Sequence, residues 1–380
     1  MQNGLRITPN RRFVRRLVLA VAMALAASPA FALRIVLTND DGFETRNIQA
    51  LFHALKAAGH DVILSAPYHD QSGTSALLGS LSNLSVTARA SSGGRIPAGS
   101  PGAGPTGIAP DQYYVDSSPV AAVLYGIDVP ARAKWGTRPD LVIAGPNVGN
   151  NLGGITPHSG TIGAAVTALN RSIPAIAVSA ANDDAASTTL LSALVLRLLA
   201  MIEDQGKVTL PAGIGLSVNV PPLDPTRPIA SYHFVFTRVA FGSDSGLRFI
   251  ADAEDQPLAA APPEEPAAFV DTSFRSETSA FGGGGTTITV SPIQGTYAAP
   301  PDRAALVLTR LRGLFAIPPA ITNPKWTNIS VRGHVGTGEA AQVLGFVIAE
   351  STTKTVLIRA AGASLAAFGI TAPLADPIME

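Results

Sequence analysis

A short apolar run that ends on two adjacent acidic residues constrains this chain more than any other feature. The run, Ile35–Leu37, lies within R-I-V-L-T-N-D-D-G at 34–42 and is typical of a strand buried on both faces of a parallel sheet. Asp40 and Asp41 follow it directly, so we expect them at the carboxyl end of that strand, where open α/β sheets bind ligands. Paired carboxylates repel each other unless a cation or a proton lies between them. The sequence therefore predicts that this pair holds a hard divalent metal ion.

Residues 1–32 are expected to be a signal peptide. Arginines precede a short apolar run at 17–27, and Ala30-Phe31-Ala32 matches a cleavage site. A membrane anchor is the alternative, but the run is shorter than the roughly 20 residues of a spanning helix. We therefore expect an exported protein, periplasmic or secreted, that has no transmembrane segment after cleavage.

The chain after this leader is mildly acidic and contains no cysteine. The leader holds five of the 27 basic residues and none of the 27 acidic ones, which leaves a formal net charge of −5. This balance disfavours a nucleic-acid polymer or an anionic membrane as a partner. Without cysteine there is no disulfide, thiolate metal site or cysteine nucleophile. The length favours one large α/β domain plus something smaller.

Strands and helices are predicted to alternate along the main domain. Apolar residues spaced i, i+3, i+4 and i+7 predict a helix over about 46–58, and the buried run at 61–67 completes a right-handed β-α-β unit. Residues 91–110 are too rich in Gly, Pro and Ser for a regular element and are read as an excursion from the sheet. Alternating segments at 232–239 and 286–291 predict hairpins that project from the main sheet. Further strands are expected at 140–145, 173–180 and 214–220, and further helices at 119–125, 162–169, 187–202 and 303–315.

The tail at 326–380 is interpreted as a separate, small β-rich module with glycines at its turns. Its segments at 329–338 and 354–377 resemble one unit of a β-rich repeat found at the ends of bacterial exported proteins. The module is a candidate for tethering or presenting the main domain at a surface.

Loops after successive strands would bring oxygen donors together if the sheet is parallel. Asp40 and Asp41 follow the first strand, Ser72 the second, and Asn147 a later one. Such an all-oxygen set suits Mg²⁺ or Mn²⁺, with Ca²⁺ as a further candidate, and does not suit Zn²⁺. The bound ion would polarise a phosphoryl group, and the helix start at Ser159–Thr161 offers N–H groups to an anion.

Each of these features taken singly has a structural alternative. An N-D-D-G string is often a turn with a helix cap, and Ser72-Gly73 can cap nothing more than a loop. Their common position after successive strands is what favours a site.

Four motifs follow one another in a specific order within residues 33–316. They are T-N-D-D-G at 38–42, A-P-x-x-x-x-S-G at 66–73, A-G-P-N-V-G-N-N-L-G at 144–153 and H-S-G-T at 158–161. In this order they resemble the SurE family of 5′/3′-nucleotidases, also called survival-protein acid phosphatases.

The resemblance implies a Rossmann-like, three-layer α/β core with a parallel sheet and a projecting β-hairpin arm. Such an arm often supports dimerisation, so a homo-oligomer is among the expected assemblies. The implied activity is hydrolysis of nucleoside 5′- and 3′-monophosphates with one divalent metal ion. Asp41 is also a candidate base for the attacking water, and the catalytic set would be Asp40, Asp41 and Asn147. Carried over by motif, the metal ligands would be Asp40, Asp41, Ser72 and Asn147, and the residues facing the phosphate would be Asn151, Ser159, Gly160 and Thr161.

The chain also departs from the family pattern. It has S-S-P-V-A at 117–121 in place of G-T-P-x-D, and T-S-A-F-G-G-G-G at 278–285 in place of T-D-F-x-x-x-D-E-G. Both changes lose acidic residues outside the metal set, so they bear on nucleoside selectivity and assembly more than on catalysis. A second hypothesis is therefore a catalytically silent, exported nucleotide-binding or surface protein on the same fold. A dinucleotide oxidoreductase is less favoured, because no G-x-G-x-x-G follows the first strand.

Overall fold

The structure is a computed structural model that divides the chain into two units, Met1–Ala298 and Ala299–Glu380. It describes residues 32–79, 86–240, 274–281 and 285–299, the backbone of 246–248 and 259–261, and single helical positions at 304, 307 and 311. Almost all of the predicted signal peptide, most of the helix predicted at 303–315 and the whole of the predicted β module lie outside the described residues. The division between the units falls earlier than the predicted domain end at 316.

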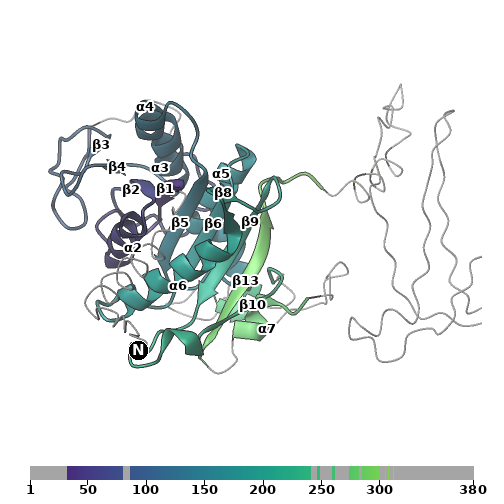
Figure 1. The fold of residues 1–380 in the computed structure, drawn as a ribbon. Helices are drawn as coiled ribbons and strands as arrows, with labels where there is room; N and C mark the ends of the chain where they lie inside the picture. Colours follow the sequence, from purple (N-terminus) through teal and green to yellow (C-terminus); the bar gives the residue numbers. More distant parts are fainter. Residues whose placement is uncertain are drawn as a thin grey trace, which may run out of the picture. The chain divides into compact units, whose positions relative to one another are not determined.

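A nine-stranded mixed sheet runs through the first unit (Figure 1). The strands are β1 (Arg34–Thr38), β2 (Asp61–Pro67), β3 (Ala103–Pro105), β4 (Gln112–Val115), β5 (Leu141–Val148), β6 (Ala175–Ala180), β9 (Ile214–Val220), β10 (His233–Phe236) and β13 (Thr287–Gln294). Their order is β10-β13-β9-β6-β5-β1-β2-β4-β3. The stretch from β9 to β4 is parallel throughout, as the sequence predicts. At the edges, β3 runs antiparallel to β4 and β13 runs antiparallel to β9, which makes the complete sheet mixed.

The two segments predicted as projecting hairpins extend the main sheet instead. β10 and β13 pair in parallel, with His233 opposite Thr287, and β13 in turn pairs with β9. A parallel pair cannot be a hairpin, because its strands need a crossover connection. Between them in the chain, β11 (Gly246–Arg248) and β12 (Ala259–Ala261) form a separate antiparallel pair. Another such pair, β7 (Glu203–Asp204) and β8 (Lys207–Val208), comes earlier, before β9.

Helices cover both faces of the sheet and create the three predicted layers. Figure 1 shows α2 and α6 on one face and α3 and α5 on the other. The helices are α2 (Arg46–Ala57), α3 (Pro119–Gly126), α4 (Arg132–Trp135), α5 (Gly160–Asn170), α6 (Ser187–Ile202) and α7 (Glu277–Phe281), with a π-helical turn at Ile127–Ala131 and 3-10 turns at Gly153–His158 and Ile229–Ser231. Within the described part of the chain, no helix is both long and apolar enough to span a bilayer.

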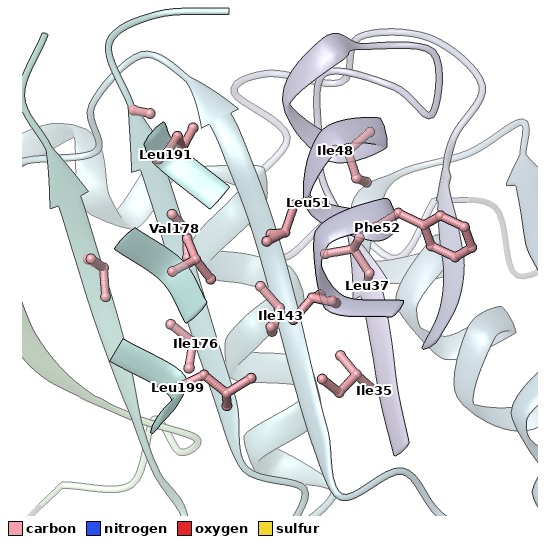
Figure 2. Packing of buried hydrophobic residues seen from close by; sticks show 14 of the residues in the cluster. Ile35, Leu37, Ile48, Leu51, Phe52, Ile143, Ile176, Val178, Leu191 and Leu199 are labelled. Atoms are coloured by element: carbon pink, nitrogen blue, oxygen red, sulfur yellow. The ribbon is translucent and has the colours of Figure 1, made fainter. Parts of the chain in front are cut away.

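Alternate residues of β1 serve the two hydrophobic layers. Ile35 and Leu37 pack under α2 and α6, whereas Val36 packs on the opposite side with α3 and α5. Figure 2 shows Ile35, Leu37 and Ile143 of the central strands beneath Leu51 of α2. Because both faces are covered, the strand is apolar along its whole length. Its acidic end therefore opens at the middle of the sheet's carboxyl edge.

Candidate functional site

A side-chain-braced turn presents the two carboxylates after β1. The buried Asn39 accepts a hydrogen bond from Gly42 N at 3.2 Å and donates one to Gly42 O at 2.9 Å. Gly42 has a φ of +108°, which L side chains rarely adopt. Asn39 and Gly42 therefore shape the turn, and Asp40 and Asp41 are the residues it displays.

Asp40 lies against the start of α5. Its side chain is 2% exposed, and Thr161 Oγ1 donates to its Oδ1 at 2.6 Å. A Cβ added at Gly160 would lie 2.9 Å from Asp40 Cβ, so glycine is needed for this close approach. Burial raises the pKa of Asp40, with a smaller contribution from the charge of Asp70, while the Thr161 hydrogen bond opposes the rise.

Asp41 points to the end of β5. Its Oδ2 accepts a hydrogen bond from Val148 N at 3.0 Å, one residue after Asn147. Burial, and then the negative charge of Asp40, raises the pKa of Asp41 from 3.8 to about 7. Without a cation, then, the pair does not readily carry two negative charges near neutral pH.

A β-bulge in β5 places Asn147 at the same edge. The register with β6 shifts between Ala144 and Asn147, across Gly145 and Pro146. Asn147 is 6% exposed and donates from Nδ2 to Gly149 O at 2.7 Å. Its Oδ1 receives no hydrogen bond from the residues that the structure describes, so this oxygen is free to serve as a ligand.

Replacing Gly145 with Ala is expected to lower the free energy of unfolding by roughly 3 kcal/mol or more, because it adds both backbone strain and a severe overlap. Gly145 has a φ of +114°, and a Cβ there would lie 2.1 Å from Val178 O. Gly136→Ala is the matched control: its φ is +67° with no atom within 4 Å of the added Cβ, so it should cost only about 1 kcal/mol. Urea unfolding of both variants measures the difference, and equal losses would contradict a special role for the bulge.

Ser72 approaches the edge on a more exposed loop. Its backbone N and its Oγ both donate to Asp70 Oδ1, at 2.8 and 2.6 Å. The neighbouring Gln71 N donates to Asp40 O at 2.7 Å, which ties this loop to the end of β1. Asp70, which the sequence analysis did not single out, therefore orients Ser72.

The residues expected to face a phosphate are also engaged with the protein. Ser159 caps α5 by accepting a hydrogen bond from Ile162 N at 3.2 Å, and the Thr161 hydroxyl is directed to Asp40. Asn151 is buried, its Nδ2 donates to Ser179 Oγ at 2.8 Å, and its backbone N donates to Asn219 Oδ1 at 2.8 Å. The hydroxyls of Ser159 and Thr161 and the Asn151 amide thus make hydrogen bonds within the protein. The N–H groups in the first turn of α5 are the donors best placed to bind an anion.

The donor set fits a hard dication. In the described part of the chain, neither Asp40 nor Asp41 forms an ion pair with a basic residue. Nor do three or more His or acidic side chains gather there into a metal site, so any ion would also need neutral oxygen ligands. Two uncompensated carboxylates beside amide and hydroxyl oxygens match the preference of Mg²⁺ or Mn²⁺ for oxygen ligands and for retained water.

Glu277 is a buried acid that the sequence analysis missed. It is 0% exposed at the start of α7, immediately before the stretch at 278–285 where family acids are lost. Burial raises its pKa, and the hydrogen bonds that it accepts oppose the rise. A lone Glu in an irregular region gives no sequence signal. The donors to its carboxylate are Gly153 N at 3.2 Å, Thr156 Oγ1 at 3.4 Å, Ala240 N at 3.4 Å and Ser291 Oγ at 3.1 Å.

Comparison with known proteins finds relatives in sequence and in fold. The sequence model of "Survival protein SurE" matches residues 35–243, which is more than half of the chain. An acid phosphatase of Yarrowia lipolytica is 37% identical over 224 residues, which is 54% of this chain and 62% of that protein. A 5′-nucleotidase SurE of Geobacter metallireducens is 34% identical over 192 residues, which is 50% of this chain and 66% of that protein.

Both matches span somewhat less than two thirds of the relative's length. The fold has a solved counterpart in the SurE protein from Aquifex aeolicus. The TM-score is 0.53 at 22% identity, and the alignment covers 73% of this chain and 99% of that one.

Proposed function

Because this chain belongs to the SurE family, we propose that it is a metal-dependent phosphomonoesterase that converts nucleoside 5′- and 3′-monophosphates to nucleoside and phosphate. The relatives named acid phosphatase and 5′-nucleotidase support this reaction class. The observation that carries the proposal is the pair of uncompensated carboxylates at the end of β1, of which Asp40 is buried and Asp41 partly buried, held between the start of α5 and the end of β5.

In this proposal, Asp40, Asp41, Ser72 and Asn147 would hold one divalent ion. When bound, the ion supplies Lewis-acid polarisation of the phosphoryl group and a water of lowered pKa. Thr161 keeps Asp40 oriented, and Val148 N keeps Asp41 oriented. The N–H groups at the start of α5 stabilise the charge on the phosphate oxygens. The role of Asp41 as a base for water stays a prediction.

The direct test is phosphate release by the purified, chelator-stripped protein. AMP and p-nitrophenyl phosphate should be hydrolysed with added Mg²⁺ or Mn²⁺, and EDTA should abolish the release. Parallel assays with Ca²⁺ identify the preferred ion. Tight, metal-dependent binding of AMP without phosphate release would instead support the catalytically silent protein.

Metal addition should raise Tm more at pH 8 than at pH 5. The raised pKa of Asp41, about 7, means that protons compete with the ion below neutrality. In the metal-free protein the raised pKa of Asp41 contributes stability that is complete below the unfolded pKa and is lost as pH rises through 7. At pH 8 the bound ion therefore restores more of the lost stability than at pH 5. Differential scanning fluorimetry with and without Mn²⁺ measures the two shifts. An equal or larger shift at pH 5 would contradict this protonation behaviour.

We also propose export to the periplasm or the medium, on the strength of the leader at 1–32. Cell fractionation combined with N-terminal sequencing tests it: the mature protein should begin near Leu33 and be absent from the cytoplasm. A homo-oligomer is proposed on family grounds, and sedimentation equilibrium measures the assembly state.

A further inference from the structure

The two carboxylates belong to different walls of the site. Asp40 faces the start of α5, where Thr161 and Gly160 contact it. Asp41 instead lines a cavity of about 220 Å³, together with residues that follow β1 and residues of the loop after β2. A substrate whose phosphate lies at the α5 end therefore has space for its remaining part beside Asp41.

The outer wall of this cavity is an ordered loop. Tyr68, 1% exposed, donates from its hydroxyl to Arg89 O at 2.6 Å and to Ile96 O at 3.0 Å. Ser91 N also donates to Ile96 O at 2.9 Å, which closes the glycine-rich turn between them. The Gly, Ser and Pro content that made this segment look like an irregular excursion thus builds a fixed wall.

Glu44 joins this wall to the turn after β1. Its carboxylate accepts a hydrogen bond from Gly93 N, and a second, longer one from Arg95 N at 3.4 Å. A Cβ at Gly93 would lie 2.6 Å from Glu44 Oε1 and 2.8 Å from its Cδ, so only glycine allows this approach. Because a carboxylate offers about four acceptor positions, Glu44 retains acceptors for a ligand in the cavity that it lines.

We propose that this cavity is the subsite for the alcohol part of the phosphate ester, and that Glu44 selects a sugar by accepting hydrogen bonds from its hydroxyls. The inference rests on the proposed function. Ser92 and Gly93 also line the cavity, and because the rest of its exposed lining is mainly apolar, Glu44 is the charged acceptor that a ribose hydroxyl would meet beside Asp41. In the reaction, water oxygen bonds to phosphorus, the P–O bond to the ribose breaks, and the departing oxygen takes up the proton that the attacking water releases, which leaves the nucleoside in this cavity.

The test compares leaving groups with and without sugar hydroxyls. The substrates are AMP, 2′,3′-dideoxy-AMP and p-nitrophenyl phosphate, and the variants are Glu44→Gln and Gly93→Ala. For AMP, KM should rise at least about tenfold in both variants, because a hydrogen bond to a charged group is lost. The kcat/KM values for dideoxy-AMP and p-nitrophenyl phosphate should stay close to those of the wild type. Gly104→Ala is the matched control, since its Cβ would make only ordinary contacts of 3.4 Å or more.

Binding of adenosine, which carries no phosphate, is a second measurement that does not depend on turnover. Ligand-observed NMR with the Mg²⁺-loaded protein should detect adenosine binding to the wild type and a clear loss in Glu44→Gln. If no ester is hydrolysed, the proposed function fails and this measurement alone decides the subsite. An equal decrease in kcat/KM for all three esters in Glu44→Gln would overturn the subsite. Adenosine binding that Glu44→Gln leaves unchanged would overturn it as well.

Discussion

Asp41→Asn is expected to lower kcat/KM for AMP by on the order of a thousandfold and to abolish the rise in Tm on adding Mn²⁺. Asp41 supplies half of the negative charge at the end of β1, and no described basic residue compensates that charge. An amide keeps the hydrogen bond from Val148 N but removes the charge that attracts the ion. Steady-state kinetics and fluorimetry on the same sample measure both effects.

The metal-free stability of this variant separates loss of function from loss of fold. Charging the partly buried Asp41 disfavours the folded state above pH 7, so the metal-free variant should be at least as stable as the wild type at pH 8. Asp128→Asn is the control: Asp128 is exposed and pairs with Arg171 beyond the far end of α5, so its removal should change neither activity nor the metal response. Wild-type activity or an intact metal response in Asp41→Asn would contradict the assigned ion site.

Glu277→Ala is expected to lower the free energy of unfolding by roughly 3–5 kcal/mol. The substitution leaves Gly153 N and Ala240 N buried without their acceptor, and also frees the hydroxyls of Thr156 and Ser291. Because Gly153 and Thr156 belong to the turn that leads into α5, the rate of phosphate-ester hydrolysis should also fall. Urea unfolding measures the stability, and kcat measures the effect on the site.

Two further variants test the cause of this loss. Glu277→Gln retains one acceptor oxygen and should cost much less, since Ser291 can turn its hydroxyl to accept from the new amide. Because burial raises the pKa of Glu277, the chelated wild type loses stability as pH rises above 4.5. Gln does not titrate, so Glu277→Gln should lose less stability over the same pH range. Glu203→Ala, which removes a single hydrogen bond to Gly206 N in a surface hairpin, should cost about 1 kcal/mol. A similar cost for the Ala substitutions at 277 and 203 would contradict the bracing role.

The apolar periodicity of the sequence was enough to predict the central layers. The strands at 61–67 and 214–220 and the helix at 187–202 have the bounds expected from the sequence. For the strands the reason is that an apolar run covered on both faces has a clear beginning and end. The strands at the edges of the sheet were harder to predict from the sequence. β4 is only four residues long, and an alternating pattern does not reveal that β10 pairs in parallel with a strand more than fifty residues away.

The same limit applies to the site. Motifs after successive strands predicted that Asp40, Asp41 and Asn147 gather at one edge, since parallel strands end together. They could not predict that Thr161 would be directed to Asp40, that Asp70 would orient Ser72, or that Glu44 would approach Gly93. Those contacts depend on loop conformations that no periodic pattern encodes.

The central position of β1 also governs how the polypeptide can assemble. Its neighbours are β2 and β5, and Ile35 pairs with Leu141. During synthesis more than a hundred residues must therefore be added after β1 before its second partner, β5, is available. Closing so long a loop slows folding. The two aspartates are translated early, but the contact of Asp40 with Thr161 at the start of α5 can form only after the polypeptide has passed residue 161.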